Sequence, residues 1–204
     1  MTVLVIVLIV VVLVVLYLAY RFNRLIRLRT RTQEAWSDID VELKRRYDLI
    51  PNLVNTVQGY AAHERGVFEA VTAARTNALA ASKTGDPTAM AGAEDALTGS
   101  TRQLLAVAEN YPQLKASELF LNLQEQLTTT EDKVEFSRRF YNGNVRDFNT
   151  ALQTFPTNIF GQMLHFQPFA FFAAADSERA APTVYFNPQA AAAPPQPPAA
   201  SPPA

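Results

Sequence analysis

The chain opens with an apolar run that no charged residue interrupts, from Val3 to Tyr20. At about 1.5 Å of rise per residue, a helix of this length crosses the hydrocarbon core of a bilayer, and it satisfies its own backbone hydrogen bonds there. Five arginines follow the run: Arg21, Arg24, Arg27, Arg29 and Arg31. We therefore predict a membrane anchor at residues 1–20, held in the lipid bilayer through residues 3–20.

A cleaved signal peptide is the alternative to an anchor, but such peptides carry positive charge before the apolar run and a small-x-small cleavage site after it. Only Met1 and Thr2 precede this run, and it ends in Leu-Ala-Tyr-Arg at residues 18–21. We expect an uncleaved, single-pass anchor. Because Lys and Arg gather on the cytoplasmic side of membrane spans, the arginines predict an N-terminus outside and a body in the cytoplasm.

Overall composition excludes several classes of function. Eighteen Lys and Arg stand against 19 Asp and Glu, for a net charge of −1, so the chain has no general basic field and nucleic acid is not an expected partner. The chain has no cysteine, which excludes disulfides, thiolate metal sites and cysteine nucleophiles.

Beyond the anchor, apolar residues recur at the three- and four-residue spacing of a helix face: Leu25, Leu28, Ala35, Ile39, Leu43 and Ile50. We predict that the anchor continues as one long helix to about Asp48. Proline is tolerated in the first turn of a helix, where its missing N–H has no intrahelical partner. Pro51 therefore predicts the start of a second helix, with Asp48 as its N-cap, which ends in a loop at residues 82–86.

Two more helices complete the prediction. Asp86 and Pro87 read as the N-cap and first residue of a third helix that ends near Asn110. A fourth helix runs to the turn before Pro156, with large apolar residues seven apart: Phe120, Leu127, Val134, Tyr141, Phe148 and Phe155. The predicted fold is all-α: a transmembrane helix that continues into an antiparallel, up-and-down four-helix bundle at residues 21–156.

The C-terminal part has two sections of different composition. Up-and-down topology returns residues 157–186 to the region of the bilayer, and this stretch is rich in phenylalanine, so it either inserts shallowly or folds over the base of the bundle as core. Residues 183–186 are a candidate for a short extended segment. Residues 187–204 carry no charge and no large apolar side chain, so we predict a disordered Ala/Pro-rich tail.

No pattern of catalytic, cofactor-binding or metal-ligating residues emerges. His63-Glu64 lacks the second histidine of a zinc-binding helix, since Val67 stands in its place. Glu34, Asp38 and Glu42 lie on one helix face, but bundle metal sites also need Glu-x-x-His, which the chain does not contain. The pairs Asp40 to Lys44 and Glu42 to Arg46 instead favour a solvated face with i,i+4 ion pairs.

Polar residues concentrate at the junction between the first two predicted helices and again in the fourth helix. We take these residues as a candidate polar cluster with a structural or interaction role: Arg45, Arg46, Asp48, Asn52, Arg138, Tyr141 and Asn142. The simpler interpretation is a clasp that fixes the turn, with Arg45 paired to Asp48. The alternative is a ligand site.

Several blocks of the chain, in order, resemble the signature of the LemA family of bacterial membrane proteins: Ala35–Val41, Leu43–Val54, Gly59–Glu64, Tyr111–Ala116, Arg138–Asn149 and Phe155–Ile159. The resemblance covers roughly residues 20–186 and leaves the Ala/Pro tail outside. It implies a single N-terminal anchor in the bacterial inner membrane and a helical bundle. It implies no catalytic residues, because none is established for the family.

Three functions remain open. In the first, the chain is a non-enzymatic, membrane-tethered scaffold or interaction module with an unidentified protein partner. In the second, it is an enzyme or a ligand- or cofactor-binding bundle that uses a polar pocket near Asp48, Asn52 and Tyr141. The third is lipid sensing by the Phe-rich segment at residues 157–186.

Overall fold

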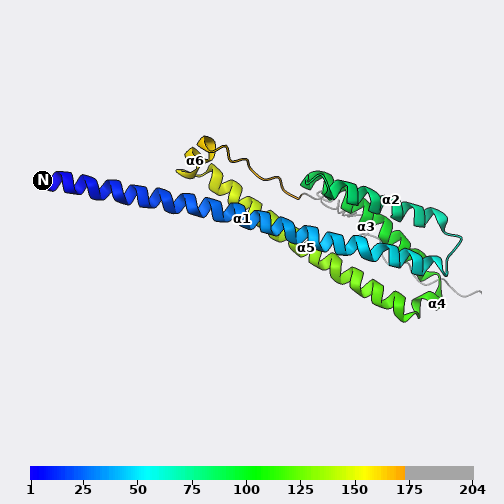
Figure 1. Cartoon of the computed structure of the whole chain (residues 1–204). Coiled ribbons are helices and arrows are strands. Elements are labelled where there is room, and N and C mark those ends of the chain that lie inside the picture. The colour runs from blue at the N-terminus through cyan, green and yellow to red at the C-terminus, as the bar shows by residue number, and fades with distance from the viewer. Residues whose placement is uncertain (173–204) are drawn as a thin grey trace, which may run out of the picture.

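The computed structural model describes residues 1–172, and in this part of the chain every regular element is a helix (Figure 1). The predicted all-α class is confirmed. The predicted tail and the short extended segment lie outside the described residues. The helices are α1 (Thr2–Gln58), α2 (Arg65–Ser82), α3 (Pro87–Glu109), α4 (Pro112–Lys115), α5 (Glu118–Gln153) and α6 (Thr157–Met163).

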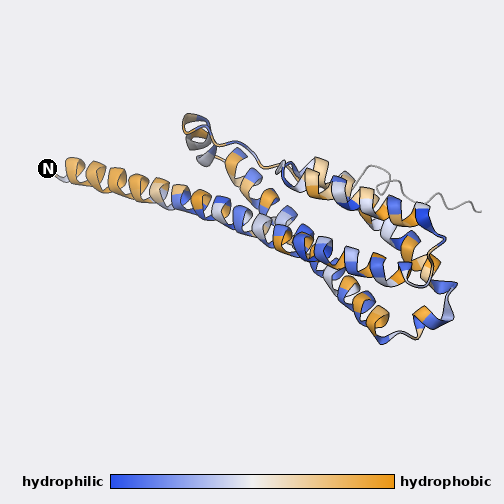
Figure 2. Ribbon diagram, turned by 45° about the vertical axis from the view of Figure 1, so that its right-hand side comes forward, coloured by the Kyte–Doolittle hydropathy of each residue, from blue (hydrophilic) through white to orange (hydrophobic). Residues whose placement is uncertain are grey.

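The first third of α1 projects beyond every other element and is apolar all round (Figure 2). Each residue from Val3 to Leu16 exposes at least 49% of its surface, although such side chains are normally buried in a water-soluble protein. By length and hydropathy, α1 is a candidate membrane-spanning helix. Its buried positions begin at Leu25, which separates the apolar span from the part of α1 that builds the bundle.

The predicted helix boundary at Asp48 is wrong, because α1 continues through Pro51 and ends at Gln58. Proline at 51 has no N–H to donate to the carbonyl of Tyr47, four residues earlier. The Nε atom of Arg75, on α2, donates to that carbonyl oxygen at 2.6 Å instead. A donor from a neighbouring helix thus replaces the missing bond, and Asp48 caps no helix.

The predicted third and fourth helices are confirmed as α3 and α5, including the N-cap of α3, where the Asp86 carboxylate accepts the Thr88 N–H at 2.9 Å. The predicted second helix is shorter than expected: its first part, residues 51–58, belongs to α1, turns occupy residues 59–64, and α2 begins at Arg65. The seven-residue seam of α5 is buried from Phe120 to Phe148. Phe155 is the exception at 72% exposed, because it follows the end of α5 and no longer faces α1.

The four long helices, α1, α2, α3 and α5, alternate in direction (Figure 1). Helix α5 packs against α1 along most of the length of α5. The α2–α3 hairpin covers the part of α1 that is farther from the apolar span. After α6 the chain turns back and runs toward the loop between α2 and α3 (Figure 1). Phe169 contacts Phe148 with ring centroids 5.1 Å apart, and Phe172 is buried beside Trp36 at 6.1 Å.

Candidate functional site

A buried ionic network centred on Arg46 joins three helices. Arg46 is 3% exposed, and its Nη1 atom donates to the Glu94 carboxylate of α3 at 2.8 Å. Its Nη2 atom donates to the Thr98 hydroxyl at 2.8 Å and to Glu131 of α5 at 3.0 Å. The hydroxyl of Tyr47 donates to the second oxygen of Glu94. Both Nη atoms of the Arg46 guanidinium and both oxygens of the Glu94 carboxylate are therefore used in joining α1 to α3 and α5.

Sequence reasoning placed Arg46 in the polar cluster but missed Glu94, Thr98, Glu131 and Tyr47. A signal was present, because Glu94 falls on the apolar stripe of α3 between Met90 and Leu97. A carboxylate at such a position requires a buried partner.

The predicted solvated face is also different from the one observed. Arg46 turns into the bundle rather than toward Glu42, and Glu42 instead lies 4.0 Å from Lys133 of α5. The ion pairs of the described residues do not include Asp40 with Lys44. Helix spacing identified which charges share a face, but packing against α3 and α5 decided their partners.

Burial and the neighbouring Glu94 carboxylate raise the pKa of the Tyr47 hydroxyl far above its ordinary value. Both effects disfavour the phenolate, and the hydrogen bond to Glu94 uses the phenolic proton. Tyr47 is therefore a hydrogen-bond donor at neutral pH, a role suited to fixing structure and unsuited to proton abstraction.

The seven residues of the predicted polar cluster do not form one site. Arg45, Asp48 and Asn52 are exposed on α1, and the predicted pair of Arg45 with Asp48 is not among the ion pairs of the described residues. Only Arg46 of the junction enters the core. The junction residues separate because α1 continues as a helix through Pro51, so that Arg46 faces α3 and α5 while Arg45, Asp48 and Asn52 face solvent.

The other three predicted residues hold the returning segment against α5. The side-chain amide of Asn142 donates to the Phe172 carbonyl at 2.9 Å and accepts its N–H at 2.8 Å. The Tyr141 hydroxyl donates to the Ala170 carbonyl at 2.9 Å, and Arg138 lies over the Phe172 ring at 4.4 Å. Asn149, which sequence reasoning missed, makes the same two bonds to Phe169.

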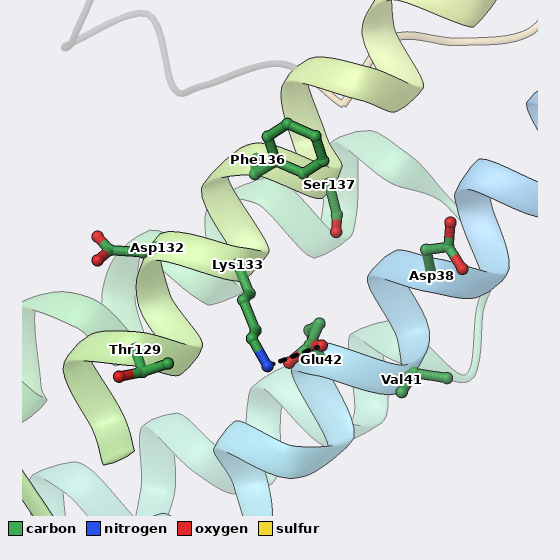
Figure 3. Close-up of a pocket in the computed structure, with 8 residues that line it drawn as sticks. All are labelled: Asp38, Val41, Glu42, Thr129, Asp132, Lys133, Phe136 and Ser137. Carbon is green, nitrogen blue, oxygen red and sulfur yellow. Dashed lines mark ion pairs between the residues drawn. The ribbon is translucent and has the colours of Figure 1, made fainter. Parts of the chain in front are cut away.

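An open groove of about 510 Å³ lies between α1 and α5, on a face that the α2–α3 hairpin leaves uncovered (Figure 3). Val41 and Phe136 supply its apolar surface and are 65% and 63% exposed. Phe140 stacks on Phe136 with centroids 6.3 Å apart and is 51% exposed. The charged groups along the groove are Asp38, Glu42, Asp132 and Lys133. The groove therefore combines exposed apolar side chains with an excess of acidic groups, and the Lys133–Glu42 ion pair links its two helices (Figure 3).

A second cavity, of about 480 Å³, lies where the returning segment passes α1. Trp36, Tyr141 and Phe169 line it together with backbone and polar groups of neighbouring residues. Of the three residues predicted to line a ligand pocket, this cavity includes Tyr141 and neither Asp48 nor Asn52. Burial raises the pKa of Tyr141 to about 12.

Comparison of the sequence with known proteins matches the chain to a family. Residues 35–186 match the LemA family. The chain is 30% identical to "Protein LemA" of Metamycoplasma hominis over 161 residues, which cover 78% of this chain and 72% of that protein.

Two more distant relatives carry magnetosome names. "Magnetosome protein MamQ 2" of Paramagnetospirillum magneticum is 24% identical over 74% of this chain, which spans 64% of that relative's length. "Magnetosome protein MamQ" of Magnetospirillum gryphiswaldense is 21% identical over 81% of this chain and 70% of its own. None of these names describes an enzyme. From the extent of the match at residues 35–186, the chain belongs to the LemA family.

Proposed function

We propose that this protein is a single-pass membrane scaffold that presents a rigid helical bundle to a protein partner and carries out no catalysis itself. The observation that supports it best is the continuity of α1, which runs without interruption from the exposed apolar span into the buried core. The relatives named as magnetosome proteins are compatible with a role at a membrane.

The interior of the bundle favours a structural role for its charges. Arg46 and Glu94 are at most 3% exposed, and the two Nη atoms and two carboxylate oxygens bond within the network, to each other, to Tyr47, to Thr98 and to Glu131. Catalytic acids and bases need access to a substrate proton. A network this buried positions helices instead.

We further propose that the partner docks in the α1–α5 groove. Its exposed apolar side chains, Val41 and Phe136, together with the adjacent Phe140, match the surface that an amphipathic helix covers when it binds a groove. Three carboxylates and one ammonium line the groove, so the complementary occupant is an apolar helix face flanked by Lys or Arg.

The test is crosslinking in living cells followed by purification of the full-length protein. The variant Phe136→Ser/Phe140→Ser removes the exposed aromatic pair, and Leu119→Ser/Leu121→Ser is the matched control. The control removes two leucines of the same helix that are 61% and 51% exposed, against 63% and 51% for the phenylalanines. A partner recovered with the wild type and the control, and lost with the phenylalanine variant, supports the proposal. Recovery of the protein alone from wild-type cells refutes it.

The orientation we propose is an N-terminus outside the bacterial inner membrane and a bundle in the cytoplasm, because the arginines follow the span directly. The chain has no cysteine, so Ala62→Cys, at an exposed position between α1 and α2, provides a single label. In intact cells it should resist a membrane-impermeant maleimide. Labelling before lysis would reverse the assignment.

The cavity beside Trp36 favours ligand binding as the second candidate function, since an aromatic wall and a few polar groups are typical of small-molecule sites. Trp36 is the chain's only tryptophan, so its fluorescence reports directly on this cavity. A saturable change on titration with a cellular metabolite extract, lost in Tyr141→Ala, would support this function over the scaffold.

A further inference from the structure

A second groove, of about 350 Å³, lies between α1 and α5 at the level where α1 leaves its apolar span. Arg21 and Arg24 line it from α1, and Arg146, Asp147 and Thr150 line it from α5. Arg21 and Arg24 are three residues apart and therefore share a face of α1, opposite a face of α5 that includes Arg146 and Thr150. The two helices together assemble this groove, and neither forms it alone.

The groove carries three guanidinium groups and one carboxylate, so its excess charge is positive. The Nε atom of Arg21 is buried and has no hydrogen-bond partner among the described residues. A buried N–H without an acceptor costs free energy, and this one lies at a site that already concentrates positive charge. The guanidinium group binds phosphate oxygens through two parallel N–H bonds. The excess of guanidinium groups and the unpaired Nε of Arg21 therefore favour the binding of an anion in this groove.

Its position relative to the span selects the kind of anion. Arg21 follows Tyr20 at the end of the apolar run, and Arg24 lies about 6 Å beyond Tyr20 at 1.5 Å per residue. The polar headgroup layer on each side of a bilayer is about 5–8 Å thick. Both arginines therefore lie at the depth of lipid phosphates when the apolar run spans the membrane.

We propose that Arg21, Arg24 and Arg146 form a phosphate-binding site that holds the phosphodiester of an anionic lipid headgroup. Lipid as the source rests on the proposed membrane anchoring, whereas free phosphate offers the same chemistry to the same groove. Bound lipid would join α5 to the end of the span through one shared anion. The bundle would then be attached to the bilayer at a second point besides its anchor.

The experiment measures thermal unfolding of the full-length protein in dodecyl maltoside, an uncharged detergent, by circular dichroism at 222 nm. The probes are dioctanoylphosphatidylglycerol, dioctanoylphosphatidylcholine and sodium phosphate. Phosphatidylglycerol at about ten times its Kd should raise Tm by roughly 3–6 °C, and phosphatidylcholine should not. An equal rise with sodium phosphate would assign the site to free phosphate.

Two variants of equal charge separate a site from general attraction. Arg24→Gln/Arg146→Gln removes two arginines of the groove and should reduce the shift below about 1 °C. Arg27→Gln/Arg31→Gln removes two exposed arginines of α1 that do not line it and should keep the full shift. Equal loss in both, or no shift in the wild type, overturns the proposal. If the groove variant is unfolded before heating, Arg146→Gln alone replaces it, because Arg146 is exposed.

The outcome is separable from that of the scaffold proposal. Partner capture depends on Phe136, which lines the other groove, and on Phe140, which stacks on it. A protein that captures its partner but shows no lipid shift refutes only the phosphate site. A lipid shift without a partner refutes only the scaffold.

Discussion

Replacing Arg75 should destabilise the bundle only while Pro51 is present. Arg75 Nε donates to the Tyr47 carbonyl, which Pro51 leaves without its helical donor. Hydrogen bonds that involve a charged group contribute about 1.5–3 kcal/mol, and an unpaired carbonyl in the interior costs a similar amount. We therefore expect Arg75→Met to lower the free energy of unfolding by about 2 kcal/mol.

In a Pro51→Ala background the same substitution should cost less than about 1 kcal/mol, because the new N–H at residue 51 reaches the Tyr47 carbonyl itself. The four proteins of this double-mutant cycle should therefore show a coupling energy of about 1 kcal/mol or more. Urea unfolding of the full-length chains in an uncharged detergent, followed by circular dichroism at 222 nm, measures it.

The matched control is Arg102→Met, which removes an exposed arginine from α3. It should change stability by less than about 0.5 kcal/mol. If Arg75→Met costs the same with proline and with alanine at residue 51, the Tyr47 carbonyl does not depend on Arg75. The explanation of the uninterrupted helix would then be wrong.

Three further outcomes are expected from the same unfolding assay. Arg46→Met leaves the Glu94 carboxylate buried without its cation and should lower the free energy of unfolding by about 3–5 kcal/mol. Arg46→Met/Glu94→Leu should lower it clearly less. A loss below about 1 kcal/mol for the single variant contradicts this expectation. Asn142→Ala removes two hydrogen bonds to the backbone of Phe172, so it should cost about 2 kcal/mol and speed amide exchange at that residue. Folding raises the pKa of Tyr141 from 10.0 to about 12. The protonated Tyr141 hydroxyl therefore contributes its full share to the free energy of unfolding below pH 10. That share, about 2–3 kcal/mol, is lost as the pH rises from 10 to 12. Tyr141→Phe should remove that part of the alkaline loss, and an unchanged alkaline profile refutes it.

The sequence predicted the helices whose evidence lies within each helix. Large apolar residues seven apart in α5, from Phe120 to Phe148, identify the face that packs on α1 without knowledge of any partner. The N-cap at Asp86 is equally local, because the carboxylate bonds an N–H two residues on.

Features that depend on distant residues were missed. Pro51 reads as a helix boundary because its missing bond is visible in sequence, whereas the compensating donor, Arg75, lies 24 positions later on another helix. Glu94 and Arg46 each stand on an apolar stripe, which signals buried charge but not which charges meet. The predicted polar cluster was divided because contacts with distant residues decide which of its side chains are buried and what they bind.

The returning segment gives even less local signal. Asn142 and Asn149 bind backbone groups of this segment rather than its side chains. Because every residue type offers a backbone carbonyl, the sequence of the segment does not show that these bonds form. The aromatic composition of residues 157–186 therefore left two positions open, on the bilayer or on the bundle. Phe169 and Phe172 lie against the bundle, and bilayer contact by the neighbouring α6 residues remains a prediction.

Because α1 is one uninterrupted helix, a change in the tilt of its apolar span also moves the bundle. Neither proline nor glycine occurs in residues 1–50, so the helix has none of the usual sites for a kink between the bilayer and the bundle core. Beyond Tyr20 it extends about 57 Å, and a change of about 10° in the tilt of the span displaces Gln58 by about 10 Å. Spans tilt by such amounts when the hydrocarbon thickness around them changes. Small changes in bilayer thickness therefore displace the far end of the bundle by about the width of a helix.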